Sequence, residues 1–216
     1  MAIEIRNYIE HTILKPEATE EEVKKVVQEA IDNRFFGVCV NPVFVKLARE
    51  ITSRSQHKPK IVTVVNFPLG ANTAETTVAQ VKQAIEEGAD EVDTVINLGA
   101  LKAKDYARVG NDIKQTKAAC GDKPLKVILE TDLLTKDEIA TASEICVQSG
   151  ADFVKTSTGF VKGGVGATVE NVALMKTFCP NVKASGGIKT REGALILIEA
   201  GATRLGTSSG LDLAKE

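Results

Sequence analysis

The chain has 216 residues, of which 43% are hydrophobic and 26% are charged, a balance typical of a globular domain. Its formal net charge of -2 argues against a surface built for nucleic acid. No stretch approaches the ~18 consecutive apolar residues of a membrane-spanning helix. Residues 1–10 carry charges throughout, unlike a signal peptide. We therefore expect a cytoplasmic protein with no membrane or nucleic-acid partner.

Cysteine and histidine are too sparse and too widely spaced to suggest metal or redox chemistry. The cysteines form no C-x-x-C pair, and the histidines are not arranged as H-E-x-x-H. We therefore predict reduced thiols, no metal ion, and chemistry carried by Lys, Asp, Glu, Ser or Thr. The residues concerned are Cys39, Cys120, Cys146, Cys179, His11 and His57.

Apolar runs alternate with helical patterns along the whole chain. The first run, 8–14, is stopped by Lys15 and Pro16, and Thr19 with Glu22 then predicts a capped helix over 19–31. The same alternation continues to the end of the chain. Further strands are predicted at 35–40, 60–67, 90–98, 125–130, 152–158, 182–185 and 203–206, and further helices at 73–87, 102–119, 135–149, 169–178, 191–200 and 208–215, with one more ending near 54.

A Gly-Ala pair joins a helix to a strand at three places, 88–89, 150–151 and 201–202. The glycine can take the left-handed conformation that ends a helix, and the small alanine permits close packing. Counting the N-terminal run gives eight strand–helix units. They predict an α/β fold, a closed (β/α)8 (TIM) barrel, as a single catalytic domain over 1–216. Without the weak first strand, a seven-stranded doubly wound sheet is the alternative.

Lys155 lies inside the apolar run 152–160, where a lysine cannot extend to solvent as it does on a surface helix. An unpaired buried ammonium is costly, so the site must pair it or lower its pKa. Asp93 interrupts the fourth predicted strand and Lys183 lies in the seventh. Because barrel strands alternate inward and outward, all three side chains could point into the mouth of the barrel. A structural salt bridge is the alternative for each of them.

These three residue types fit one kind of chemistry. A second ammonium close to Lys155 disfavours its charged form, and Lys183 could supply that field. An amine of lowered pKa can attack a carbonyl and form a Schiff base, whose iminium withdraws electrons and permits carbon–carbon cleavage beside it. Asp93 is then the obvious carboxylate for moving protons.

Two glycine-rich turns follow the seventh and eighth predicted strands, at 185–188 and 206–210. In barrels these two positions often bind phosphate through backbone N–H groups, to which serine hydroxyls add donors. The alternative is a pair of tight turns with a helix cap at Ser208 or Ser209. The predicted phosphate-binding residues are Gly186, Gly187, Gly206, Ser208 and Ser209.

Other residues near the strand ends carry weaker signals. Thr12 is a candidate hydrogen-bonding group for substrate, and Cys39 is expected to be a buried structural thiol. The segment 163–168 is rich in glycine but lacks the Lys-Ser/Thr of a P-loop. We expect it to be a flexible loop that leads into a helix and covers the site.

The order of the motifs resembles the deoxyribose-phosphate aldolase family along nearly the whole chain. The matching stretches are 11–16 (HTILKP), 38–42 (VCVNP), 66–70 (NFPLG), 91–97 (EVDTVIN), 153–159 (FVKTSTG), 183–188 (KASGGI) and 206–210 (GTSSG). The resemblance implies a class I aldolase barrel that needs no metal and no cofactor. It implies reversible cleavage of 2-deoxy-D-ribose 5-phosphate into acetaldehyde and D-glyceraldehyde 3-phosphate, within deoxyribose catabolism.

The resemblance also implies roles by motif position. Lys155 matches the Schiff-base lysine, Lys183 the lysine that perturbs it, and Asp93 the proton-relay aspartate. Thr158 and Gly159 belong to the lysine motif and are expected to contact substrate, while the two glycine-rich turns match the phosphate site. Relatives are commonly dimers or tetramers, so we expect a homodimer or homotetramer.

The sequence departs from the family pattern in three places. Glu10 stands where the family usually has Asp, and its extra methylene would shift any carboxylate contact to substrate. The last tyrosine is Tyr106, so we expect no tail tyrosine to reach the site, and water or Asp93 to move the proton instead. The loop 160–168 looks longer than usual. Two alternatives stay open: an aldolase for another phosphorylated sugar, and a non-catalytic barrel that binds sugar phosphate.

Overall fold

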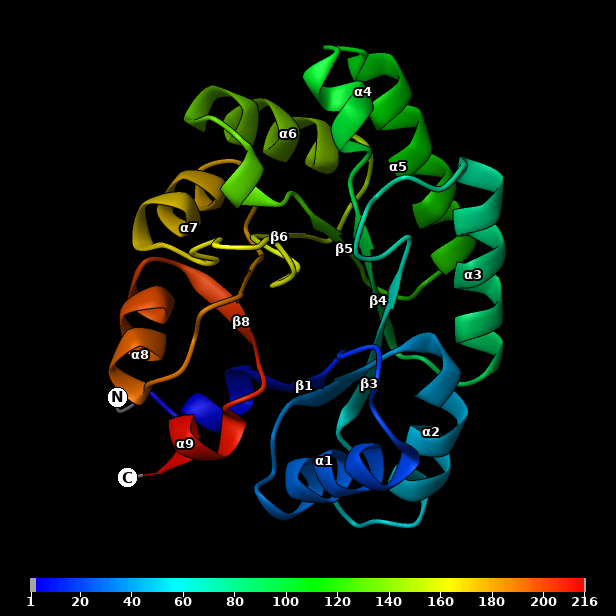
Figure 1. The fold of residues 1–216 in the computed structure, drawn as a ribbon, viewed down its shortest axis with the longest axis vertical. Helices are drawn as coiled ribbons and strands as arrows, with labels where there is room; N and C mark the ends of the chain where they lie inside the picture. Colours follow the sequence, from blue (N-terminus) through cyan, green and yellow to red (C-terminus); the bar gives the residue numbers. More distant parts are fainter. Residues whose placement is uncertain (1–2, 216) are drawn as a thin grey trace.

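Eight parallel strands form a closed barrel in the order of the sequence, in a computed structural model that describes residues 3–215 (Figure 1). Each strand pairs with the next, and β8 returns to pair with β1. The strands are β1 (Ile9–Ile13), β2 (Gly37–Val40), β3 (Lys60–Val65), β4 (Glu91–Val95), β5 (Leu125–Ile128), β6 (Phe153–Lys155), β7 (Val182–Ser185) and β8 (Ala202–Thr207). The predicted (β/α)8 barrel is confirmed, and the seven-stranded alternative is wrong because β1 pairs on both sides.

The helices surround the barrel as an outer ring (Figure 1). The α-helices are α1 (Glu20–Asp32), α2 (Val45–Ser53), α3 (Ala74–Glu86), α4 (Leu98–Lys102), α5 (Tyr106–Cys120), α6 (Lys136–Gln148), α7 (Val169–Lys176), α8 (Arg191–Glu199) and α9 (Gly210–Ala214). Short 3-10 turns are η1 (Ile5–Tyr8), η2 (Pro42–Phe44) and η3 (Thr131–Leu133). None of the helices within residues 3–215 has the length and apolar character to cross a membrane.

Threonine begins helices repeatedly in this chain. Thr19 and Thr135 each form a full capping box, in which the hydroxyl accepts a backbone N–H and a glutamate three residues on accepts the threonine's own N–H. The remaining threonine caps are Thr73, Thr168 and Thr190. Because each cap satisfies an N–H group at the helix start, it fixes the boundary between the loop and the helix.

The helix predicted over 102–119 is present as α5, but it begins later, at Tyr106, and the short α4 before it was not predicted. The chain turns between them at Lys104, whose φ is 59°, and Asp105 caps α5 by accepting from the N–H of Arg108 at 3.1 Å. The strand predicted over 90–98 ends earlier, at Val95, since the Asn97 side chain caps α4. Both differences come from local side-chain caps, at Asn97 and Asp105, that the pattern of apolar residues does not reveal.

The strand predicted over 152–158 is also shorter than expected. Beyond Lys155, side chains take over contacts that a regular strand makes through its backbone. Thr156 Oγ1 donates to the carbonyl of Ser185 at 2.9 Å and accepts from the N–H of Ser185 at 3.0 Å. The chain therefore stays tied to β7 after the strand ends, which fixes the loop that follows Lys155.

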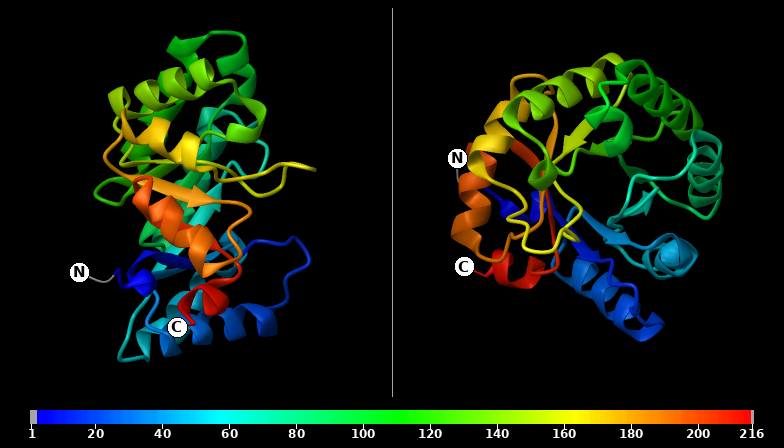
Figure 2. Two further views of the ribbon diagram at one scale, coloured as in Figure 1. Left: turned by 90° about the vertical axis from the view of Figure 1, so that its left-hand side faces the viewer. Right: turned by 45° about the horizontal axis from the view of Figure 1, so that its top comes forward.

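Most apolar side chains pack between the barrel and its helices. A second, smaller apolar cluster lies on β2 and β3 and the segment after β1, and consists of Leu14, Cys39, Val62 and Val64 with Phe67 packed against it. The loops after β1 and β6 project from the same end of the barrel, as the blue and yellow loops show in the left view of Figure 2. This is the end to which the carboxyl ends of all eight strands point.

Candidate active site

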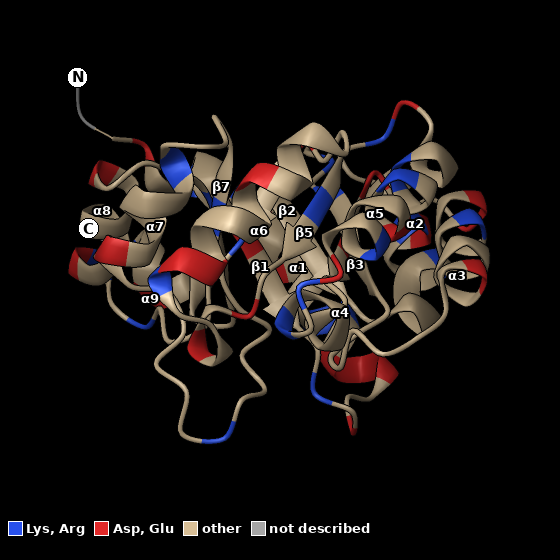
Figure 3. Ribbon diagram, turned by 90° about the horizontal axis from the view of Figure 1, so that it is seen from above, with Lys and Arg blue, Asp and Glu red and all other residues tan. Residues whose placement is uncertain are grey.

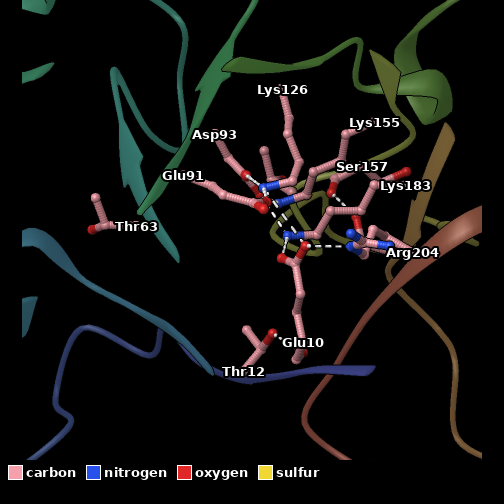
Figure 4. A network of polar contacts seen from close by, with 12 residues as sticks. Glu10, Thr12, Thr63, Glu91, Asp93, Lys126, Lys155, Ser157, Lys183 and Arg204 are labelled. Carbon is pink, nitrogen blue, oxygen red and sulfur yellow. Dashed lines mark hydrogen bonds and ion pairs between the residues drawn. The ribbon is translucent and has the colours of Figure 1, made fainter. Parts of the chain in front are cut away.

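The barrel interior brings together Asp93, Lys155 and Lys183, which the sequence singled out from three separate strands (Figure 4). Asp93 Oδ2 accepts a hydrogen bond from Lys155 Nζ at 2.7 Å and another from Lys183 Nζ at 2.7 Å. All three side chains are at most 3% exposed. One carboxylate oxygen is therefore shared by both lysines.

Strand register explains why these groups meet. Lys155 on β6 is the direct partner of Lys183 on β7, and Asp93 on β4 is the direct partner of Lys126 on β5. In a parallel barrel, partner residues on adjacent strands present their side chains to the same face. The four groups therefore point into the barrel together.

The cluster has further members that were not predicted from the sequence. Lys126 Nζ lies 3.1 Å from Asp93 Oδ1, 2.6 Å from Glu91 Oε2 and 3.5 Å from Glu10 Oε1. Lys183 also pairs with Glu10. Arg204 Nε lies 4.0 Å from Glu10 Oε1. Lys126 could have been found by the argument used for Lys155, since it too interrupts an apolar strand.

The carboxylate at the centre of the cluster is ionised. Burial by itself raises the pKa of Asp93, but Lys126, Lys155 and Lys183 outweigh it and hold the pKa well below its usual range. The opposite holds for the two supporting lysines. Burial lowers the pKa of Lys126 and Lys183, but their carboxylate partners more than offset it, so both pKa values are raised and both amines stay charged.

Lys155 is the exception among the three buried lysines, because its pKa is lowered. Burial is the largest cause, and the neighbouring Lys183 ammonium lowers the pKa further, while Asp93 opposes both. Lys155 is therefore the amine that most readily loses its proton. Burial therefore lowers this pKa more than Lys183 does, whereas the sequence had pointed to Lys183 as the cause.

A cavity of about 670 Å³ opens above Lys155 at the carboxyl ends of the strands. Asp93 and Lys183 are not among the described residues that line it, whereas Lys155 is. Ser209 is also outside the lining set, and its N–H donates to Thr207 Oγ1 at 2.9 Å. The predicted substrate-binding residues that do line the cavity are Thr12, Thr158, Gly159, Gly186, Gly187, Gly206 and Ser208.

The glycines of the two turns serve the cavity in different ways. Gly186 and Gly187 have φ of 85° and 75°, a conformation that glycine adopts without strain, so their backbone can face the cavity. At Gly206, an added Cβ would lie 2.9 Å from Lys183 Cε. Glycine at this position therefore leaves room for the buried Lys183 side chain.

Glu10 does not lie where a substrate contact requires it. Its side chain is fully buried and faces Lys183 and Lys126 from below (Figure 4). The expected contact between this carboxylate and substrate is therefore replaced by contacts with Lys126 and Lys183. Cys39 is buried as expected, and burial raises the pKa of its thiol to about 11. His11, which carried no signal, lines the cavity and pairs with Glu29 at 2.8 Å.

The loop 160–168 leads into α7 as expected, and its far end is held in place. The Asp132 carboxylate accepts from the N–H of Val165 at 2.8 Å and from the N–H of Gly166 at 3.0 Å. Gly166 packs against Gly186, where an added Cβ would lie 2.4 Å from the Gly186 carbonyl carbon. The loop therefore supports one of the glycine turns that line the cavity.

Two further contacts hold the start of this loop. The buried carboxyl of Glu130 accepts from the N–H of Thr158 at 3.1 Å and from the Thr158 hydroxyl. The rings of Phe160 and Phe67 meet edge to face, with centroids 5.3 Å apart. Phe160 lines the cavity, and Phe67 supports it through this ring contact. Neither contact was foreseen from sequence, because each joins separate loops.

Within residues 3–215, no three or more His, Cys, Asp or Glu side chains come together in a way that could hold a metal ion. The buried cluster instead supplies an amine, two ammonium groups and an ionised carboxylate. Such a set can form an imine with a carbonyl compound and transfer protons around it.

A closed parallel barrel with a buried, low-pKa lysine facing a glycine-lined cavity defines a barrel enzyme of the lysine-aldolase class. The model of the DeoC/LacD family of aldolases matches residues 7–215. The chain belongs to this family.

Known relatives agree with the family assignment. The chain is 52% identical to deoxyribose-phosphate aldolase of Brevibacillus brevis over 212 residues, which are 97% of this chain and 94% of the relative. A solved structure described as "QR15, an Aldolase" matches with a TM-score of 0.91 and 42% identity, covering 99% of this chain and 95% of its own. A tetrameric structure of deoxyribose phosphate aldolase from Aeropyrum pernix matches with a TM-score of 0.84 and 31% identity, covering 96% and 88%.

Proposed function

We propose that this chain is a class I aldolase that reversibly cleaves 2-deoxy-D-ribose 5-phosphate into acetaldehyde and D-glyceraldehyde 3-phosphate. The observation that carries the proposal is the position of Lys155, which lines the cavity while Asp93 and Lys183 are buried beside it. The family membership and the half-identical relatives named deoxyribose-phosphate aldolase support the choice of substrate.

Lys155 is the nucleophile in this scheme. Its unprotonated amine attacks C1 of the open-chain sugar, and loss of water leaves an iminium between Nζ and C1. Burial and the Lys183 ammonium both favour the neutral amine that this attack requires. Lys183 stays charged and does not compete as a nucleophile.

Cleavage then breaks the bond between C2 and C3. The C3 hydroxyl gives up its proton, C3 becomes the aldehyde of glyceraldehyde 3-phosphate, and the electron pair of the broken bond moves to the iminium, giving an enamine. Protonation of the enamine at C2 and hydrolysis release acetaldehyde and the free lysine. The ionised Asp93, acting directly or through water, is the proton carrier for these steps.

The phosphate end of the sugar faces the two glycine turns. Gly186 and Gly187 line the cavity with φ of 85° and 75°, a conformation that lets backbone N–H groups approach an anion, and Ser208 adds a hydroxyl at the cavity wall. Ser209 belongs to this proposal through its turn, although it does not line the cavity. Thr158 and Gly159 follow Lys155 directly after β6, and Thr12 lines the cavity from β1, so these three residues are assigned to the sugar chain.

Borohydride trapping tests the reaction class and the site together. Acetaldehyde with borohydride should leave an ethyl group on Lys155, located by peptide mass mapping, and Lys155→Met should abolish the label. Lys126→Met is unsuitable as the control because it disturbs the cluster. Lys117→Met, which removes an ion-paired lysine on α5, should label like the natural chain. Labelling at another lysine by an active preparation contradicts the proposal.

Substrate choice needs a separate assay. Coupled assays with deoxyribose 5-phosphate and with other sugar phosphates distinguish this aldolase from one for another sugar. A barrel that only binds sugar phosphate would show saturable binding with no turnover and no trapped adduct.

The assembly, compartment and domain division are proposed on separate grounds. A homodimer or homotetramer is supported by the tetrameric relative from Aeropyrum pernix and is tested by light scattering after gel filtration. A cytoplasmic location fits the four free, buried cysteines. Positive and negative residues are mixed along the outer helices (Figure 3), unlike the single-sign face that nucleic acid requires. The closed barrel supports one catalytic domain over 1–216.

A further inference from the structure

The buried cluster beneath the cavity contains more charge than the proposed chemistry uses. Its ion pairs join three carboxylates to four basic side chains, all within 4.0 Å of a partner. Apart from Glu91 and Arg204, which reach the edge of the cluster, its members are at most 3% exposed. They are Glu10, Glu91, Asp93, Lys126, Lys155, Lys183 and Arg204.

Counting the charges within the cluster shows that Lys155 is the cation whose charge is least compensated. With every member ionised, the four cations exceed the three carboxylates by one positive charge. Net charge is strongly disfavoured in a dry interior, and a buried group neutralises when it can. Arg204 cannot lose its proton, and Lys126 and Lys183 each contact two or three carboxylates. Lys155 contacts one, which it shares with Lys183.

We propose that Lys126, with its partner Glu91, is a positioning residue that sets the protonation state of the Lys155 nucleophile by balancing the charge of the buried cluster. Lys126 occupies Asp93 Oδ1 and leaves Oδ2 for the two other lysines. This inference rests on the proposed function, because it takes Lys155 as the attacking amine. It adds two residues that the aldolase motifs of the sequence did not mark for any role.

The charges that face Lys155 come from every side of the barrel. The carboxylates of β1 and β4, the ammonium groups of β5 and β7, and the β8 guanidinium belong to the cluster. Two titratable groups lie outside it: the neutral Cys39 thiol on β2 and the Glu130 carboxyl after β5, which is held by Thr158. The full set is Glu10, Cys39, Glu91, Asp93, Lys126, Glu130, Lys183 and Arg204.

Removing a positive charge from the cluster and removing a negative charge from it should move the Lys155 pKa in opposite directions. Lys126→Met leaves an excess of carboxylate, which a proton on Lys155 offsets, so its pKa rises. Glu91→Gln leaves an excess of cation, so the pKa of Lys155 falls. The double variant Lys126→Met/Glu91→Gln removes one charge of each sign and restores the balance. Lys126→Arg keeps the charge.

The measurement is the rate at which acetaldehyde and cyanoborohydride label Lys155 between pH 5 and pH 10, read by intact mass. Acetaldehyde has no titratable group, so the acid limb of the profile reports the free lysine. We expect Lys126→Met to move this limb upward by about one pH unit or more, and Glu91→Gln to move it downward. The double variant and Lys126→Arg should return close to the natural profile. Lys117→Met, at a partly exposed ion pair that contains no member of the cluster, should not move it.

The possible outcomes distinguish failure of the charge-balance role from failure of the proposed function. If Lys126→Met and Glu91→Gln leave the limb unchanged, or move it in the same direction, the charge-balance role is wrong while the aldolase function stands. If Lys126→Met does not fold, the other two variants still test the role. Glu91→Gln should move the acid limb to lower pH, and the double variant should move it back. If the natural chain acquires no label at Lys155, the proposed function itself fails.

Discussion

At the scale of single residues, Asp93 holds the site together because it contacts three lysines through two oxygens. Lys155 and Lys183 share Oδ2, and Lys126 takes Oδ1. The arrangement keeps the carboxylate ionised, keeps two lysines charged, and leaves the third as the group of lowest proton affinity. In the proposed mechanism, the same side chain therefore organises the nucleophile and carries its protons.

Lys183→Leu tests this organisation at one position. Lys183 lowers the pKa of Lys155, so its removal raises that pKa. Because the reaction needs the neutral amine, present only above the Lys155 pKa, the acid limb of kcat/KM should move to higher pH. Turnover at neutral pH should fall by at least tenfold, since one pH unit below the pKa leaves about a tenth of the amine unprotonated. An unchanged pH profile would remove Lys183 from the mechanism.

The residues that could be predicted from sequence share one property. Lys155, Asp93 and Lys183 are charged side chains inside apolar strands, so burial makes them conspicuous. Lys126 is also a charged side chain inside an apolar strand and could have been predicted in the same way. Glu10 and Glu91 lie at strand ends, where an acid looks ordinary, and only the closed barrel reveals that both point inward onto Lys126.

At the scale of elements, the loop after β6 is positioned by carboxylates from the neighbouring loop after β5. Glu130 holds its start through Thr158, and Asp132 holds its end through Val165 and Gly166. The loop in turn supports the turn after β7, where Ala167 N–H donates to the Gly186 carbonyl at 3.0 Å. Three consecutive strand–helix connections therefore form one supported rim.

Asp132→Ala should weaken this rim without touching the lysine cluster. Loss of the bonds to Val165 and Gly166 leaves the Gly186 turn less well held, so phosphate binding should weaken. We expect KM for deoxyribose 5-phosphate to rise roughly three- to tenfold, the effect of about one ordinary hydrogen bond, with kcat nearly unchanged. Asp122→Ala, on the exposed turn before β5, is the matched control. A fall in kcat at constant KM would contradict a positioning role.

At the scale of the whole molecule, closure between β1 and β8 makes the barrel one cooperative unit. Leu205 on β8 is fully buried and pairs in register with Ile9 on β1. The sequence predicted this closure from the count of eight units, but left the first strand in question as the weakest of the eight. Its polar residues, Glu10 and His11, are buried by contacts with other strands and with α1, which no local pattern reveals.

Leu205→Ala should destabilise the whole domain rather than one edge. Large-to-small changes of a buried leucine cost about 2–5 kcal/mol, so the urea midpoint should fall clearly. The unfolding curves by fluorescence and by circular dichroism should still coincide. Leu69→Ala, at a side chain that is 75% exposed, should leave the midpoint within error. Separate transitions for the two probes would contradict a single cooperative barrel.

The placement of the thiols has a consequence for handling the protein. All four cysteines are buried, and burial raises the pKa of Cys39 and Cys120 to about 11 and that of Cys146 still higher. Alkylating reagents and peroxide react with exposed thiolate, so the intact fold conceals every reactive sulfur. Modification of a cysteine therefore requires local unfolding of the strand or helix that contains it. The order in which the four cysteines are modified ranks these elements by local stability.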